Sequence, residues 1–369
     1  WLERERENLA GAVQEADGAG FTTVARRLAG NLYSYLSTGM YTGDCSEPAT
    51  TALRRRARPV RRGGADDDVA ALGLVCWRLG QLHEAAQHFA REARHFRDLD
   101  AARAEAVSHT NLGVVHRALG RPGDAIRTLG GALPIHLHDG NKFSETVALN
   151  GLSGAYTDLG DTVTGRLLAH TALAAARTLR NRALEANAHL ALGAAQERAQ
   201  RSAEAADSYR EALRLAELVN DRFPQAAALV GLATAQARLD PRAALRTAED
   251  AVTLSREARF RMLEGCALDA LARVRVRLGE SRTALESGHA ALAVHRETGH
   301  RPGEARSHLA LGHAQAALGA RSRAFGHWRE SLRLSRAMAD GGSSAPAVSP
   351  VLPVRPAERR TQDETAGQR

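Results

Sequence analysis

The amino-acid sequence predicts an all-α protein, a solenoid of antiparallel helix pairs built from about seven repeats of about forty residues. Three observations support this prediction. Residues 111–133 have the pattern of a helical hairpin, because a helix-type apolar pattern breaks at Pro122-Gly123 and then restarts. The same pattern recurs along most of the chain at a fixed period, which is typical of solenoids. Aromatic residues make up only 4% of the chain and Ala is frequent, which favours closely packed helices over sheets.

Each repeat has one leucine in its first helix that precedes a small residue, and we call this leucine the anchor. The anchors are spaced by 40 residues, with one spacing of 39: Leu72, Leu112, Leu152, Leu192, Leu232, Leu271 and Leu311. In five units a Leu-Gly step ends the first helix, at Gly80, Gly120, Gly160, Gly279 and Gly319. We expect these glycines to end the helix in the left-handed conformation, which costs glycine least.

The second helix of each unit carries a small residue at a fixed distance from the anchor. This distance is thirteen residues, or twelve in the fifth unit, where Asp240-Pro241 replaces the glycine turn. These residues are Ala85, Ala125, Gly165, Ala205, Ala244, Ala284 and Ala324. Small residues at fixed places let helix backbones approach, and larger neighbours fill the gaps. One unit alone cannot bury its apolar face, so we expect the array to be the stable entity.

Charge and hydropathy exclude several classes of protein. The net charge is +8, of which six arginines within residues 54–62 supply +6, so the remaining chain carries +2. A general nucleic-acid-binding surface is therefore not predicted. No apolar run is long enough for a membrane span and no signal peptide is recognisable, so we expect a cytoplasmic protein. The three cysteines lie far apart outside any CxxC spacing and indicate reduced, mostly buried thiols.

The pattern divides the chain into four parts. Residues 1–38 are expected to form an amphipathic helical hairpin that precedes or caps the solenoid, which spans residues 69–340. Residues 341–369 are rich in Gly, Ser and Pro and are expected to be a disordered tail. Residues 39–68 form an irregular, Arg-rich linker with three interpretations: a basic docking strip, a solvated loop, or degenerate sequence.

Motifs that would indicate catalysis or metal binding fail on spacing. The HEAAQH segment at residues 83–88 separates its histidines by five positions, so they diverge on a helix, unlike the pair in a zinc-protease HExxH motif. Ser153 lies in a GLSG sequence that is not a nucleophile elbow, because it occupies the small-residue position of a repeat. His109, His189 and His308 share one repeat phase, which indicates packing or surface use. We therefore predict no catalytic residue, no cofactor, no metal site and no enzyme.

The anchors of the first helices and the small residues of both helices recur in an order that resembles the tetratricopeptide repeat (TPR), over residues 69 to about 339. The resemblance implies a right-handed superhelix whose first helices line the concave side. It also implies that ligands bind there, at positions two and five residues before and after each anchor. The larger polar residues so placed are Thr110, Arg117, Asn150, Asn187, Glu197, Asp269, Arg273, Arg306 and His313. The Lys and Asn carboxylate clamp of chaperone-tail binders is absent at these positions.

The opening sequence narrows the resemblance. WLxxExxNL at residues 1–9, followed by a hairpin and forty-residue repeats, is similar to the C-terminal part of actinobacterial SARP-type and NB-ARC signal-transduction ATPase regulators. This similarity implies a non-catalytic sensor arm of a longer regulator that binds a protein or peptide, or packs against an upstream ATPase domain. The chain does not begin with Met, so we expect it to be a piece of a longer protein. The alternative is a free-standing TPR adaptor or signalling-peptide receptor.

Overall fold

The computed structural model describes residues 12, 15, 16, 19, 21 and 73–340, so the expectations for residues 39–68 and 341–369, and for nearly all of 1–38, lie outside the described residues. Residues 73–78 are helical. The helices that follow are α5 (Leu82–Asp98), α6 (Ala102–Ala118), α7 (Pro122–His138), α8 (Lys142–Asp158), α9 (Thr162–Thr178), α10 (Arg182–Arg198), α11 (Ser202–Leu218), α12 (Arg222–Leu239), α13 (Pro241–Glu257), α14 (Arg261–Arg277), α15 (Ser281–Thr298), α16 (Arg301–Ala317) and α17 (Arg321–Asp340).

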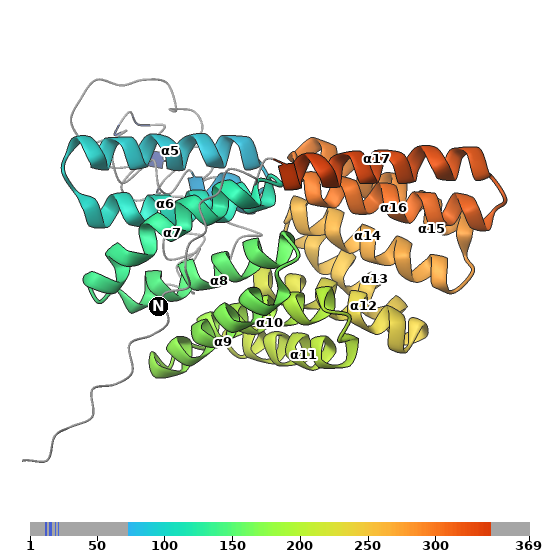
Figure 1. Ribbon diagram of the computed structural model, residues 1–369, viewed down its shortest axis with the longest axis horizontal. Coiled ribbons are helices and arrows are strands. Elements are labelled where there is room, and N and C mark those ends of the chain that lie inside the picture. Colours follow the sequence, from blue (N-terminus) through green and yellow to red (C-terminus); the bar gives the residue numbers. More distant parts are fainter. Residues whose placement is uncertain (1–11, 13–14, 17–18, 20, 22–72, 341–369) are drawn as a thin grey trace, which may run out of the picture.

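The helices stack in antiparallel pairs, as Figure 1 shows. Each first helix packs against the second helix of its own unit, and also against the first helix of the next unit, from α6 through α8, α10, α12 and α14 to α16. The described part of the chain contains no strand. The predicted fold, an all-α right-handed superhelical solenoid, is confirmed. None of the described helices has the length and apolar character required to cross a membrane.

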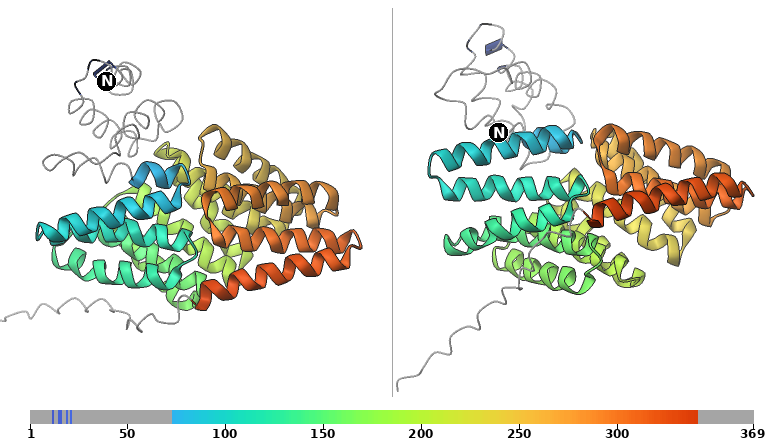
Figure 2. Two further views of the ribbon diagram at one scale, coloured as in Figure 1. Left: turned by 90° about the horizontal axis from the view of Figure 1, so that it is seen from above. Right: turned by 45° about the horizontal axis from the view of Figure 1, so that its top comes forward.

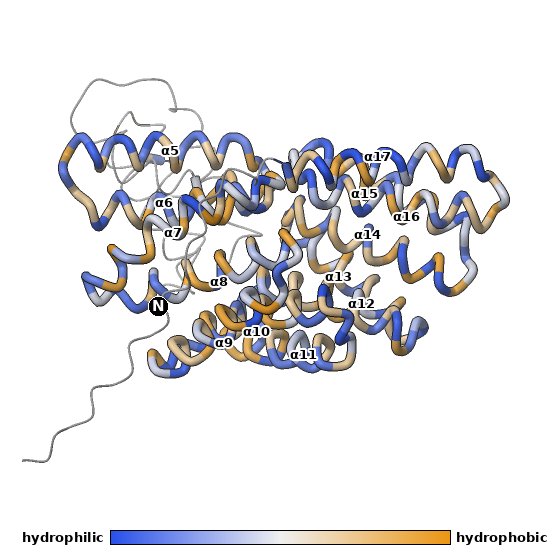
Figure 3. Tube along the Cα trace, in the orientation of Figure 1, coloured by the Kyte–Doolittle hydropathy of each residue, from blue (hydrophilic) through white to orange (hydrophobic). Residues whose placement is uncertain are grey.

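The anchors and small residues lie where the repeat predicts. The six anchors from Leu112 to Leu311 are 0% to 9% exposed, and the small residues from Ala85 to Ala324 are buried as well. Figure 3 shows apolar and polar residues alternating along each helix, because only one stripe of each helix faces its neighbours.

A second set of matched positions determines how closely the two helices of a unit approach. We call the residue seventeen positions after the anchor, or sixteen in the fifth unit, the knob. Large knobs lie against the glycine that follows an anchor, as Tyr209 lies against Gly193 and Trp328 against Gly312. A Cβ atom at either glycine would come within 2.8 Å of the facing ring. Where the knob is only Ala169 or Ala248, the residue after the anchor is Ser or Ala rather than Gly. In these units a large knob faces a glycine and a small knob faces a larger residue, so the two side chains together fill a similar volume between the helices.

The turns use the left-handed conformation at regular places. The five glycines predicted to end first helices have φ values from 73° to 93°. The fourth unit has Gln200 instead, at φ 63°, and several second helices end at non-glycine residues in the same conformation. A residue with a Cβ atom in this conformation lowers the stability of the fold relative to glycine at the same position.

Two glycines test how much the left-handed turn conformation costs. Both have room for a Cβ atom, but one has helical backbone and the other has a positive φ. Gly131 lies inside α7 and Gly160 in a turn at φ 93°, and a Cβ would meet no atom within 4 Å at either position. We expect Gly131→Ala to raise the free energy of unfolding by about 0.5–1 kcal/mol, because alanine is the better helix former. Gly160→Ala should lower it by about 1–2 kcal/mol. Urea unfolding of both variants measures this; effects of the same sign would contradict the argument.

The superhelix closes upon itself, which the repeat pattern does not predict. The aromatic ring of Phe223, at the start of α12, lies 6.5 Å from Trp77 of the first unit and 5.1 Å from Phe260, which precedes α14. These rings belong to an apolar cluster that includes Leu82, Phe89, Leu112 and Val115 of the first two units. Next to it, a Cβ at Gly120 would lie 2.6 Å from the sulfur of Met338 in α17. Units one and two therefore pack against units five to seven (Figure 2).

Candidate functional site

Polar side chains of several first helices influence one another across the closed superhelix. We call them the inner cluster: Arg117 of α6, Asp158 of α8, Glu197 of α10, Asp269 and Arg273 of α14, Arg306 of α16, and the knob Tyr209 of α11. Their proximity shows in their electrostatics. Burial and the charge of Glu197 raise the pKa of Tyr209, whereas Arg117, Arg306 and Arg273 oppose this rise. Side chains as far apart in sequence as Arg117 and Arg306 thus share one environment.

Arg117 crosses from the second unit to the third. Its Nε donates to Asp158 Oδ2 at 2.8 Å. The guanidinium passes over Gly154, where a Cβ atom would lie 2.5 Å from Arg117 Nε. A side chain at position 154 would therefore displace Arg117, so the glycine beyond the anchor of α8 also serves the inner cluster.

Arg306 forms the corresponding contact in the sixth and seventh units. It lies 3.6 Å from Asp269 Oδ2, and Asp269 is 2% exposed. Burial raises the pKa of Asp269, while the charges of Arg306 and Arg273 lower it. The second oxygen, Oδ1, is buried without a hydrogen-bond partner among the described residues.

Among the nine predicted residues, Asn150 has both an unpaired hydrogen-bond donor and an unpaired acceptor. Both its Nδ2 and Oδ1 are buried without a partner in the described part of the chain. Leaving a buried polar group unpaired costs about 1–3 kcal/mol. This side chain lies two residues before the anchor of α8, at the position where the resemblance expects ligand contacts.

The remaining predicted residues have different environments. Thr110 is 2% exposed, and its hydroxyl lies 2.9 Å from His136 Nε2 of the second helix, so it is packed inside its own unit. Asn187 is exposed, and so is His313, whose ring packs edge-on against Trp328. Glu197 lies 3.9 Å from Arg238 on the next first helix. Of the nine predicted residues, Arg117, Glu197, Asp269, Arg273 and Arg306 are brought together.

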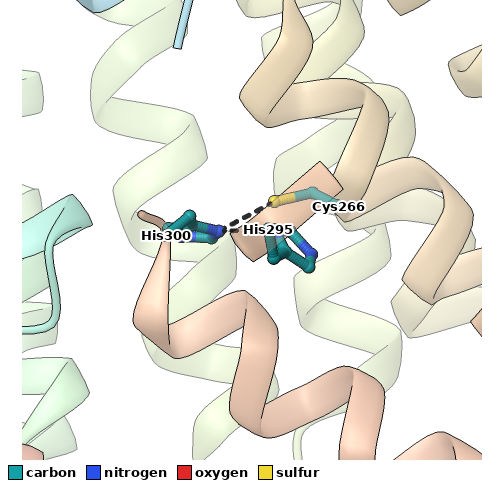
Figure 4. A group of neighbouring side chains, drawn as sticks. All are labelled: Cys266, His295 and His300. Atoms are coloured by element: carbon teal, nitrogen blue, oxygen red, sulfur yellow. Dashed lines mark hydrogen bonds between the residues drawn. The ribbon is translucent and has the colours of Figure 1, made fainter. Parts of the chain in front are cut away.

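A group that the sequence interpretation missed lies beside Arg306. His300 Nδ1 is 3.9 Å from Cys266 Sγ and 3.1 Å from His295 Nδ1, and Arg306 Nη2 donates to the same sulfur at 3.6 Å. Figure 4 shows the three side chains facing one another. Cys266 lies five residues before its anchor, in phase with Arg306, so a search of all residue types at that phase would have found it.

Burial keeps this group electrically neutral. Burial lowers the pKa of His295 to about 3, with Arg306 acting in the same direction and the Gly265 carbonyl opposing it. Burial also lowers the pKa of His300, helped by His295 and Arg306. The pKa of the Cys266 thiol is raised by burial, against the charge of Arg306. Both imidazoles are therefore neutral near pH 7, with a lone pair available on each.

Comparison with known proteins identifies the fold. No sequence family matches the chain, and no curated protein matches it either. A Rap protein complexed with competence and sporulation factor is similar in structure, with TM-score 0.61 and 13% identity over 92% of this chain and 99% of that chain. The Rap conjugation gene regulator of plasmid pLS20, in complex with a Phr peptide, has TM-score 0.58 and 12% identity, over 89% and 96%.

The apo form of the quorum sensor NprR from B. thuringiensis has TM-score 0.54 and 12% identity, over 90% of this chain and 98% of that chain. Identities this low show a shared fold alone. The chain thus has the fold of TPR-like helical-repeat proteins.

Proposed function

We propose that this chain is a non-catalytic, peptide-binding regulatory module, and that the inner cluster and Asn150 receive an extended peptide. The observation that carries the proposal is the Asn150 amide, which has a free donor and a free acceptor. One asparagine amide can accept from the N–H and donate to the C=O of a peptide backbone. A bound peptide would remove the cost of the unpaired amide once neighbouring side chains part to admit it.

The charges of the inner cluster suit a peptide better than a polyanion. The inner cluster contains three guanidinium groups, on Arg117, Arg273 and Arg306, and three carboxyl groups, on Asp158, Glu197 and Asp269. These formal charges cancel, and Arg238 beside Glu197 adds one positive charge, which is too little to attract a nucleic-acid backbone. Both signs are available for the charged ends and side chains of a short peptide. Two similar structures are complexes, with competence and sporulation factor and with a Phr peptide, which supports this choice.

The test is selection from a display library of short linear peptides, followed by measurement of the selected peptides in solution. We expect Asn150→Ala to weaken their binding about tenfold to a hundredfold, the effect of losing one or two buried hydrogen bonds. Gln87→Ala is the control, because Gln87 is an exposed amide on the second helix α5, outside the predicted ligand positions, and it should leave affinity unchanged.

Two outcomes would overturn the proposal. One is a library from which no peptide is retained by the natural chain. The other is a set of peptides that binds Asn150→Ala as tightly as the parent, since binding would then occur elsewhere. Unfolding curves of both variants check that any loss of binding is not a loss of folding.

We further propose that the module is the C-terminal arm of a longer transcriptional regulator that carries an ATPase domain. The WLxxExxNL opening at residues 1–9 supports this, and it is independent of the inner cluster. Peptide binding would then bias the regulator only if the peptide favours one of its two states over the other. The complete reading frame tests this: a stop codon directly upstream of Trp1 would leave the free-standing peptide receptor.

A further inference from the structure

The Cys266, His295 and His300 side chains combine three metal-binding groups from three consecutive segments. Cys266 comes from α14, His295 from the last turn of α15, and His300 from the turn that precedes α16. One ligand atom of each lies within 4.8 Å of the others. A thiol and two imidazoles are the ligand types that Zn²⁺ prefers.

Two of the three separations between ligand atoms are close to those of a tetrahedral zinc site, and the third, between Cys266 and His295, is within 4.8 Å. Bonds of about 2.0–2.1 Å to nitrogen and about 2.3 Å to sulfur place two nitrogens about 3.3 Å apart, and sulfur about 3.6 Å from nitrogen. The observed separations are 3.1 Å between the Nδ1 atoms of His295 and His300 and 3.9 Å between His300 Nδ1 and Cys266 Sγ. Shifts of a few tenths of an ångström would therefore bring His300 Nδ1 to the separations from His295 Nδ1 and Cys266 Sγ that a bound zinc ion requires.

The ring of His295 is held in place by its surroundings. It is 0% exposed and lies between Gly265 and Gly303, where added Cβ atoms would come within 2.7 Å and 2.2 Å of the ring. The absence of side chains at both positions makes the space for the ring. Such confinement fixes the direction of Nδ1 before a ligand arrives, which is what a metal site requires.

The neighbouring charges are compatible with a bound cation. Arg306 contacts the Cys266 sulfur and favours its thiolate form, and Asp269 pairs with Arg306 at 3.6 Å and balances its charge. Cys266 as a whole residue is half-buried, whereas His295 and His300 are buried. A second histidine pair, His308 and His327, has its Nδ1 atoms 3.0 Å apart, but no third ligand group joins it among the described residues.

From this geometry we propose that Cys266, His295 and His300 bind one Zn²⁺ ion through Sγ and the two Nδ1 atoms. Binding releases the thiol proton to the solvent, and both imidazoles supply the lone pair of Nδ1 with their proton on Nε2, so the ring that donates between the two Nδ1 atoms in the metal-free protein changes tautomer. Three protein ligands leave a fourth position for a solvent molecule. Arg306 contacts this site and also belongs to the inner cluster, but none of the three metal ligands is a proposed peptide contact, so the metal site does not rest on peptide binding.

The test is a Co²⁺ titration of the full chain, because tetrahedral cobalt bound to a thiolate absorbs strongly in the visible and near-ultraviolet. We expect one equivalent of Co²⁺ to produce these bands, and one equivalent of Zn²⁺ to remove them. Cys266→Ser should abolish the thiolate-to-cobalt band, and His300→Gln should weaken binding at least tenfold. The combined Cys45→Ser and Cys76→Ser variant and His327→Gln should behave like the parent.

The proposal is overturned if the natural chain gives no thiolate band with Co²⁺, or if Cys266→Ser retains it. It is also overturned if His300→Gln binds as tightly as His327→Gln, since Cys266 would then act with other ligands. Circular dichroism of each variant establishes that the helices are intact. Because His300→Gln replaces a side chain in a turn, it keeps the test decisive should Cys266→Ser fail to fold.

Discussion

Replacing Phe260 with Ala is expected to open the superhelix and to lower the free energy of unfolding by about 3–5 kcal/mol, as for other buried phenylalanines. Phe260 is 1% exposed and lies edge-on to Phe223 at 5.1 Å. Both rings contribute to the apolar cluster that joins the first two units to the fifth and sixth. Removing the Phe260 ring leaves a cavity at this junction, and the array can relieve the cavity by separating its two ends.

Small-angle scattering and urea unfolding measure the two effects, as a larger radius of gyration and a lower midpoint. Phe325→Ala is the control, because Phe325 belongs to α17 and is 70% exposed, so both quantities should stay at the parental values. A variant that loses stability but keeps the parental radius would show that the remaining contacts, including that of Gly120 with Met338, suffice to keep the array closed.

Tyr209→Ala is expected to cost about as much, roughly 3–5 kcal/mol, because it removes the largest knob of the middle units. Tyr209 is 7% exposed, and its ring lies between Gly193 and Gly231, where added Cβ atoms would come within 2.8 Å and 2.3 Å. The two glycines have no side chains to fill the space that the ring leaves. Denaturant unfolding of the variant measures the loss.

The knob pairing predicts that the effects of two substitutions are not additive. Gly193→Ala alone should cost about 1–3 kcal/mol, because its Cβ would overlap the tyrosine ring. In the double variant with Tyr209→Ala this overlap is gone, so the total cost should be smaller than the sum of the two by about 0.5–3 kcal/mol. The fifth unit already pairs Ala233 with Ala248, both 0% exposed. Strict additivity would show that the residues do not share one packing site.

The repeat fold could be predicted from the sequence because its determinants are local. The anchors, the small residues of the second helices and the turn glycines recur at one period, and each acts on a neighbouring helix. The side of the first helix on which Asn150 and Arg117 lie could be predicted for the same reason, from their phase in the repeat, whereas their contact with a ligand stays a prediction. Thr110 has the same phase as Asn150, yet its hydroxyl forms a hydrogen bond with His136 of the next helix, which the phase alone does not show.

Contacts between distant units were decided only by the tertiary structure. Trp77, Phe223 and Phe260 meet because the superhelix turns far enough to return to its start, and small rotations per repeat that the sequence pattern does not encode determine that path. The same holds for Cys266, His295 and His300, whose spacings match no metal-binding motif. They lie together because a first helix, a second helix and the next turn converge around two glycines. The sequence by itself thus determined the repeating unit, whose interactions are local. The tertiary structure decided which of its polar side chains share a site, because that depends on summed rotations along the whole array.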